Sequence, residues 1–214
     1  MTIKIREPVN AITHLFGALL SVVGLGLLLN AAVSSGEMTK IISSIIFSLG
    51  LIGLYTTSAV YHGIHRYIPL FRKLDHTMIY FLIAASYTPI CLVTLRGRTG
   101  GIFLGIIWSM AVLGGVLKFL WLSAPRWLYT SFYLILGWAA LFILIPLYRE
   151  LPFTAIELLV GGGLFYTLGA VIYGTKSRRL RIGVFGFHEI FHIFILLGSL
   201  SHYIMIYRYV IAAN

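Results

Sequence analysis

The chain has 214 residues, of which 59% are hydrophobic and only 10% are charged. Because so few charged side chains cannot cover the surface of a water-soluble domain, this composition excludes an ordinary soluble enzyme and favours a protein that faces lipid. The net charge of +10 would suggest nucleic-acid binding in a soluble protein, but the basic residues lie in short gaps between apolar stretches, so no nucleic-acid partner is expected.

Seven stretches are long and apolar enough to cross a bilayer, which takes about 20 mostly apolar residues. In chain order they are residues 11–33, 41–61, 77–95, 102–122, 128–147, 153–173 and 187–207. A polar segment precedes the first stretch, and no small-residue cleavage site indicates a signal peptide. We therefore predict an all-α membrane protein in which residues 1–214 form one seven-transmembrane helix bundle.

Proline, glycine and cysteine residues inside these stretches predict local features of the bundle. Pro89 lies in the third stretch and Pro146 in the fifth, and each predicts a kink. The glycines at 114–115 and 161–163 predict positions at which neighbouring helices approach closely. The single cysteine, Cys91, excludes a disulfide framework and an all-cysteine zinc site, and its apolar neighbours predict ordinary helix packing.

Lysine and arginine are distributed unequally between the two ends of the predicted helices. One end collects eleven of them: Lys4, Arg6, Arg66, Arg72, Lys73, Lys118, Arg126, Lys176, Arg178, Arg179 and Arg181. The other end collects five: Lys40, Arg96, Arg98, Arg149 and Arg208. Since cytoplasmic loops carry the excess of basic residues, the count predicts that the N-terminus is cytoplasmic and the C-terminus lies outside.

Polar residues from separate helices are predicted to lie at one depth, near the cytoplasmic face. His62 ends the second stretch, and Ser58 precedes it by one turn on the same side of the helix. Asp75, the only aspartate in the chain, opens the third stretch. His188 and His192 lie in the first turns of the seventh. Because ionisable groups in a bilayer are costly, this shared depth points to a functional site.

The spacing of His188 and His192 predicts a metal site. Residues four apart project from one helix face, which suits two ligands of one zinc ion. His62 is the best-placed third ligand, and three imidazoles leave one tetrahedral position open, as in catalytic zinc sites. Asp75 and Ser58 would then lie beside the open position. The string from His188 to His192 also matches the zinc-protease pattern H-E-x-x-H, but no later acidic ligand follows, so we give that match little weight.

Structural roles are the alternative for each of these residues. His62, His188 and His192 can help helices pack, and Asp75 can cap the N-terminus of the third helix, because carboxylates favour that position. The sequence leaves both readings of Asp75 open.

Four further polar residues are expected to have structural roles. Glu7, Asn10 and His14 are expected to tie the N-terminal segment to the bundle rather than to bind metal. His202 lies about 15 Å deeper than His192 by helical rise, too far to share an ion, and Glu157 is its expected partner.

The whole chain resembles the bacterial hemolysin III proteins, within the progestin and adipoQ receptor family that includes the adiponectin receptors. The wider superfamily includes alkaline ceramidases. The resemblance rests on Glu7, Asn10 and His14, on Ser58-x-x-x-His62, on Asp75, and on His188-x-x-x-His192 with His202. It implies a seven-helix bundle with its N-terminus inside, zinc bound by His62, His188 and His192, and Ser58 and Asp75 beside the bound water. The expected location is the plasma membrane, in bacteria the inner membrane.

Three classes of function follow from these observations. The first is a zinc-dependent intramembrane hydrolase that cleaves an acyl bond of a membrane lipid, by resemblance an amide, with Asp75 as general acid or base. The second is a non-enzymatic lipid sensor or receptor in which zinc joins two helices. The third is a lytic membrane protein, implied by the hemolysin name alone.

Overall fold

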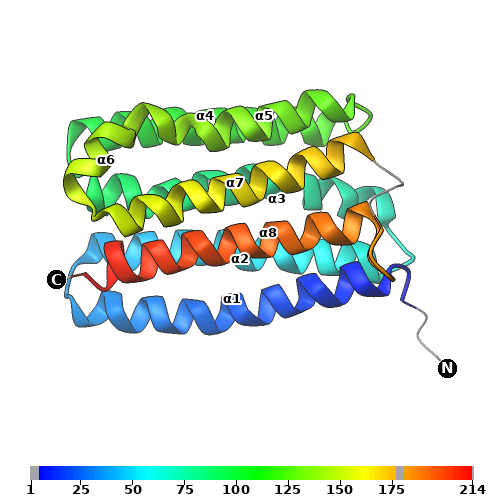
Figure 1. Ribbon diagram of the computed structural model, residues 1–214, viewed down its shortest axis with the longest axis horizontal. Coiled ribbons are helices and arrows are strands. Elements are labelled where there is room, and N and C mark those ends of the chain that lie inside the picture. Colours follow the sequence, from blue (N-terminus) through cyan, green and yellow to red (C-terminus); the bar gives the residue numbers. More distant parts are fainter. Residues whose placement is uncertain (1–4, 177–180, 214) are drawn as a thin grey trace.

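The computed structural model describes residues 5–176 and 181–213, and its regular structure is helical (Figure 1). Within these residues, seven helices or helix combinations are long and apolar enough to cross a membrane. The elements are α1 (Pro8–Ser34), α2 (Met38–Gly63), α3 (Ile68–Pro89), η1 (Ile90–Thr94), α4 (Arg98–Leu120), α5 (Arg126–Trp138), η2 (Ala139–Ile143), α6 (Leu144–Glu150), α7 (Phe153–Thr175), α8 (Phe187–Ile206) and η3 (Tyr207–Ile211). The predicted seven-helix architecture is confirmed.

The helices form a closed ring. Neighbours in the chain pack against each other from α1 to α5, α5 then packs against α7, and α7 packs against α8. The ring closes because α8 also packs against α1. The first and last described residues lie at opposite ends of the bundle (Figure 1). We call the end at which α1 begins the N-terminal end.

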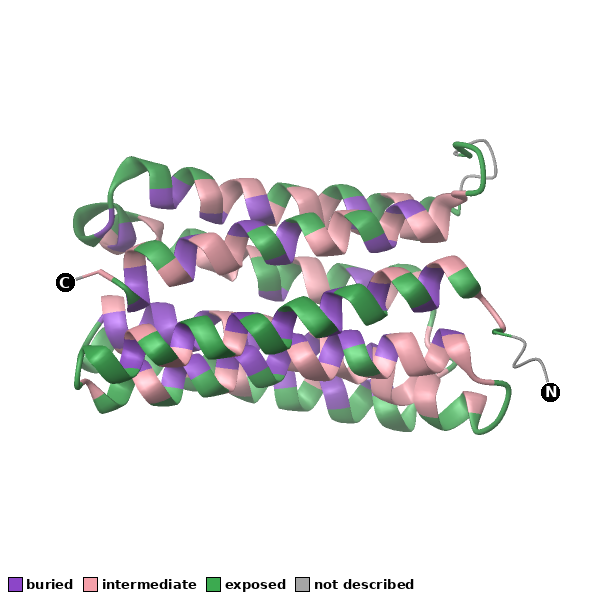
Figure 2. Ribbon diagram, turned by 90° about the horizontal axis from the view of Figure 1, so that it is seen from below, coloured by how far each residue is buried: buried purple, intermediate pink, exposed green. Residues whose placement is uncertain are grey.

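The outward faces of the helices are apolar. Large hydrophobic side chains such as Leu19, Leu120 and Phe142 are exposed there, and exposed residues follow the outer surface of the bundle (Figure 2). A surface of this kind is unfavourable in water and favourable in hydrocarbon. The fold is therefore that of a multi-pass membrane protein.

Helix α3 begins earlier than the hydropathy predicts. It starts at Ile68 rather than near residue 77, so Asp75 lies about two turns inside the helix. Of the two readings of Asp75 that the sequence leaves open, the cap at the helix N-terminus is therefore wrong. The physical reason is that apolar composition marks the part of a helix inside the bilayer, whereas polar residues such as Arg72 and Lys73 continue the same helix beyond it.

Both predicted proline sites show a change in helix type. The π-helix η1 follows Pro89 directly, and the 3₁₀ segment η2 ends three residues before Pro146. A proline ring clashes with the carbonyl four residues earlier, so the preceding or following turn adopts a different hydrogen-bond pattern. The Tyr87 hydroxyl satisfies groups freed in this region, because it donates to Gly137 O at 2.6 Å and accepts from Ala140 N–H at 2.7 Å.

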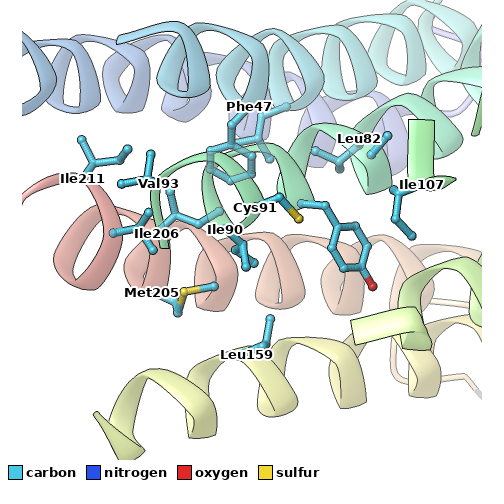
Figure 3. Packing of buried hydrophobic residues seen from close by; sticks show 14 of the residues in the cluster. Phe47, Leu82, Ile90, Cys91, Val93, Ile107, Leu159, Met205, Ile206 and Ile211 are labelled. Atoms are coloured by element: carbon cyan, nitrogen blue, oxygen red, sulfur yellow. The ribbon is translucent and has the colours of Figure 1, made fainter. Parts of the chain in front are cut away.

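Glycine permits close packing at two of the predicted places. A Cβ on Gly114 would lie 2.5 Å from the Tyr80 ring, and one on Gly162 would overlap the His202 ring, whereas Gly161 faces open space. Cys91 is buried among apolar side chains such as Phe47 (Figure 3), as expected.

Some of the basic residues on which the predicted orientation rests lie outside the described residues. Lys4, Arg178 and Arg179 are outside them. Arg72 and Arg126 lie in the wall of a cavity within the bundle.

Candidate metal centre

Three histidines from two helices meet at the N-terminal end of the bundle. His62 ends α2, and His188 and His192 occupy the first turns of α8. Their ring centroids form a nearly equilateral triangle with sides of 4.9–5.0 Å. One nitrogen from each ring lies within 4.8 Å of the other two. His62 and His192 are each about 1% exposed, so two of these polar rings are held away from solvent.

This donor set fits a metal ion. Ligands bound to one tetrahedral zinc at about 2.0–2.1 Å lie roughly 3.4 Å apart, so small side-chain movements would bring the three nitrogens onto one ion. Nδ1 of His192 is buried with no hydrogen-bond partner among the described residues. Because buried polar atoms are normally paired, an unpartnered imidazole beside two others is the pattern expected of a ligand group. The three histidines could therefore hold a metal ion.

Glu7 orients the His62 ring. Its Oε2 lies 2.6 Å from His62 Nδ1, so Nδ1–H donates to the carboxylate and Nε2 is left for a metal. The hydrogen bond from His62 is the main cause that lowers the pKa of Glu7 to about 2. Metal-binding histidines commonly donate their other N–H to a carboxylate in this way. The sequence predicts only a tethering role for Glu7, because a carboxylate placed before the first helix does not show which side chain it meets.

The tethering role itself is confirmed. Backbone N–H groups of Arg6 and Glu7 donate to carbonyls of Gly63 and His62 at 3.4 and 3.0 Å. The chain before α1 is therefore fastened to the end of α2, which holds Glu7 beside the His62 ring.

Asn10 and His14 of α1 extend this connection to α8. The Asn10 amide donates to Glu7 at 3.2 Å and to Glu189 at 3.0 Å, and the other oxygen of Glu189 accepts from Gly186 N–H at 2.8 Å. The His14 ring stacks on His192 with centroids 3.6 Å apart. Glu189 thus stabilises the start of α8 and its contact with α1, which agrees with the low weight given to the protease pattern.

Asp75 and Ser58 lie beside the histidines, in the wall of the same cavity. His62, Ser58 and Arg72 are electrostatic neighbours of the Asp75 carboxylate. Ser58 is on α2 one turn before His62, as the spacing predicts. A carboxylate and a hydroxyl are therefore present next to the three imidazoles, inside the bundle.

The cavity extends from this centre into the bundle. Its volume is about 360 Å³. Along α3 and the start of η1 its lining runs from Arg72 to Ile90, which corresponds to about 27 Å of helix. Most of the wall is formed by apolar and aromatic side chains from α2, α3, α5, α7 and α8. The cavity is long and largely apolar, with its charged groups at the histidine end.

The expected pairing of His202 with Glu157 is wrong. His202 Nε2 lies 3.0 Å from the carbonyl oxygen of Leu159, its ring packs against Tyr166, and the Glu157 side chain is exposed. His202 faces the cavity, whereas Glu157 points away from the bundle. The spacing along α8 correctly placed His202 away from the three histidines, but sequence alone did not indicate which face of α7 it contacts.

Seven apolar spans around a buried group of three histidines define the class: a multi-pass membrane protein with a centre that could hold a metal ion. Within this class, the chain belongs to the Haemolysin-III related family, whose sequence model matches residues 2–203. The resemblance described above is thereby confirmed.

Relatives from bacteria and mammals match along nearly the whole chain. Hemolysin-3 of Bacillus cereus is 34% identical over 214 residues, covering 99% of this chain and 95% of that protein. The Hemolysin-3 homolog of Bacillus subtilis (strain 168) is 36% identical, with 97% and 95% covered. The human Monocyte to macrophage differentiation factor is 28% identical, with 95% and 84% covered.

Proposed function

We propose that this protein is a zinc-dependent intramembrane hydrolase that cleaves the acyl amide bond of a membrane lipid. The observation that carries the proposal is the three-histidine group at the polar end of a long, largely apolar cavity, with Asp75 in the same wall. The apolar part suits a lipid chain, and the polar end suits the bond to be cleaved. The choice of zinc rests on the three-imidazole donor set, which is typical of catalytic zinc sites. Imidazole also suits other transition metals, so metal analysis of the purified protein tests this choice.

The proposed orientation follows from the distribution of basic residues. Eleven lysines and arginines on one side against five on the other favour a cytoplasmic N-terminus. The centre would then lie near the cytoplasmic face of the plasma membrane, the inner membrane of a bacterium. A reporter enzyme that is active only outside the cytoplasm, fused after residue 214, tests this: activity supports the orientation and inactivity of an expressed fusion refutes it.

The polar residues around the cavity would have different roles in hydrolysis. His62, His188 and His192 would hold the zinc ion, which would supply a Lewis acid for the lipid carbonyl and lower the pKa of a nearby water. Asp75 would take a proton from the attacking water and return it to the leaving amine, so that amide and water yield a carboxylic acid and an amine. Ser58 would hold the water or the Asp75 carboxylate by hydrogen bonding. Glu7 would fix the orientation of His62.

Asp75→Asn is the direct test of this mechanism. We expect lipid amide hydrolysis to fall by about 10²–10⁴-fold, the usual contribution of a general acid or base, while zinc content stays unchanged. Glu37→Gln is a matched control, because Glu37 lies between α1 and α2, in the loop where it pairs with Arg96. Full activity of Asp75→Asn, or of protein stripped of metal, would refute the assignment.

The alternative function is a sensor in which the metal has a structural role, and the variant His192→Ala distinguishes it from the hydrolase. His192→Ala would then lower the thermal stability of the bundle, and no lipid would be turned over by the wild-type protein. The proposed hydrolase instead requires measurable turnover that is lost together with zinc in His192→Ala.

A further inference from the structure

A second polar cluster lies deeper in the cavity, in the middle of the bundle. It consists of Tyr55 on α2, Tyr166 on α7, and Ser199 and His202 on α8. Tyr166 and His202 lie in the cavity wall. By helical rise His202 is about 15 Å from His192, so this cluster is separate from the three-histidine group. Polar groups at such depth cost free energy unless they are hydrogen-bonded to each other or to a ligand.

Two contacts link the three hydroxyl groups of this cluster. The Tyr55 hydroxyl donates to Ser199 Oγ at 2.7 Å, and Ser199 Oγ lies 2.8 Å from the Tyr166 hydroxyl, a contact in which either oxygen can be the donor. A serine hydroxyl carries one proton. When Ser199 accepts from Tyr55 and gives its own proton to the Tyr166 oxygen, the Tyr166 proton is available to a ligand in the cavity, and our inference takes this arrangement.

His202 supplies an acceptor next to that donor. Its Nε2–H donates to the Leu159 carbonyl at 3.0 Å, so Nδ1 of the neutral ring is an acceptor. Within residues 5–176 and 181–213, the hydrogen bond of the His202 ring is the one made by Nε2, and it leaves Nδ1 available. The His202 and Tyr166 rings pack edge to face with centroids 5.4 Å apart. A hydroxyl group and an imidazole acceptor are therefore carried by two neighbouring rings of the cavity wall.

Glycines make room for both rings. A Cβ on Gly162 would overlap His202, and one on Gly198 would lie 2.7 Å from Tyr166. The backbone of α7 and α8 thus admits two aromatic polar side chains where larger residues would exclude them. An unused donor and acceptor in an apolar cavity favour a ligand that satisfies both, and a hydroxyl group does so because it donates and accepts at once.

We propose that Tyr166 and His202 form a subsite that recognises a hydroxyl group partway along the chain of the bound lipid. The inference rests on the proposed lipid-binding role of the cavity and specifies the class of lipid: one hydroxylated in mid-chain, not only at the polar head. Tyr55 and Ser199 are positioning residues that direct the Tyr166 proton.

The test compares the binding of two fatty acids that differ by one hydroxyl. The purified full-length protein is titrated with octadecanoic acid and with 12-hydroxyoctadecanoic acid, and occupancy is measured by native mass spectrometry after release from detergent. Two neutral hydrogen bonds predict a preference of about tenfold for the hydroxylated acid. 2-Hydroxyoctadecanoic acid, whose hydroxyl lies beside the carboxylate, should bind no better than the unsubstituted acid.

Variants assign the preference to the two side chains. Tyr166→Phe keeps the ring and removes the donor, so the preference should fall to about threefold or less. Tyr203→Phe is the matched control, because Tyr203 lies on α8 and donates to Gly24 O instead; it should keep the wild-type preference. The wild-type comparison of the two acids needs no variant and stands even if Tyr166→Phe does not fold.

The outcomes separate this inference from the proposed hydrolase. Equal binding of the 12-hydroxylated and unsubstituted acids would overturn the hydroxyl subsite and leave the hydrolase proposal intact. Binding of neither acid would overturn the subsite and the lipid-binding role together. If the wild-type protein prefers the 12-hydroxylated acid about tenfold but hydrolyses no lipid amide, the subsite is supported and the hydrolase proposal is refuted.

Discussion

The contact between Glu7 and His62 yields the sharpest prediction about the metal centre. In Glu7→Gln the amide oxygen can still accept the hydrogen bond from His62 Nδ1, but the negative charge that now lies 2.6 Å from that nitrogen is lost. Residues that support a metal ligand in this way typically change metal affinity by about 10–100-fold. Because the Glu7 side chain is 39% exposed, solvent offsets part of the loss, so the lower end, about tenfold or about 1.4 kcal/mol, is expected.

Zinc affinity is measured by competition with a chromophoric chelator at fixed pH. Thermal unfolding of the metal-free proteins shows whether the bundle itself is unchanged. Glu37→Gln removes a carboxylate outside the membrane spans at the other end of the bundle and should leave zinc affinity at the wild-type value. Unchanged zinc affinity in Glu7→Gln, with zinc bound by the wild-type protein, would refute the argument that Glu7 tunes His62.

Two further predictions concern stability in detergent. Gly162→Ala forces a methyl group against His202 and should lower the free energy of unfolding by about 1–3 kcal/mol. Gly161→Ala is its control, because a methyl group there meets open space and should not lower the stability. Equal melting temperatures of the two variants would contradict the described packing of His202. Tyr87→Phe leaves the Ala140 N–H without its acceptor and should cost about 1–3 kcal/mol. The exposed Tyr148 provides the control Tyr148→Phe, and a similar loss in both variants would argue against the described role of Tyr87.

The number and order of the spans could be predicted because lipid imposes a simple requirement on composition. Each span needs an apolar stretch of sufficient length, and this signal is strong. The histidine group was predictable for a related reason: ionisable residues are rare in such stretches, so His62, His188 and His192 stand out. Their shared depth follows from alternating helix directions alone.

Other features could not be predicted because they depend on which helix faces meet. The start of α3 lies in a polar segment where hydropathy carries no signal about helix continuation. Glu7 precedes the first helix, and only the fold brings its carboxylate to His62. Tyr166 and Ser199 look like ordinary residues of membrane helices, and their relation to His202 becomes visible only when α7 and α8 are packed together.

The closed ring has a consequence for how this protein assembles. The three histidines come from the second and the last of the membrane-crossing helices, and Glu7 and His14 come from the first. During synthesis the ligand group therefore remains incomplete until α8 has entered the membrane and met α1 and α2. An ion could bind all three histidines only after that step, and its binding would then stabilise the packing of α8 against the helices made first.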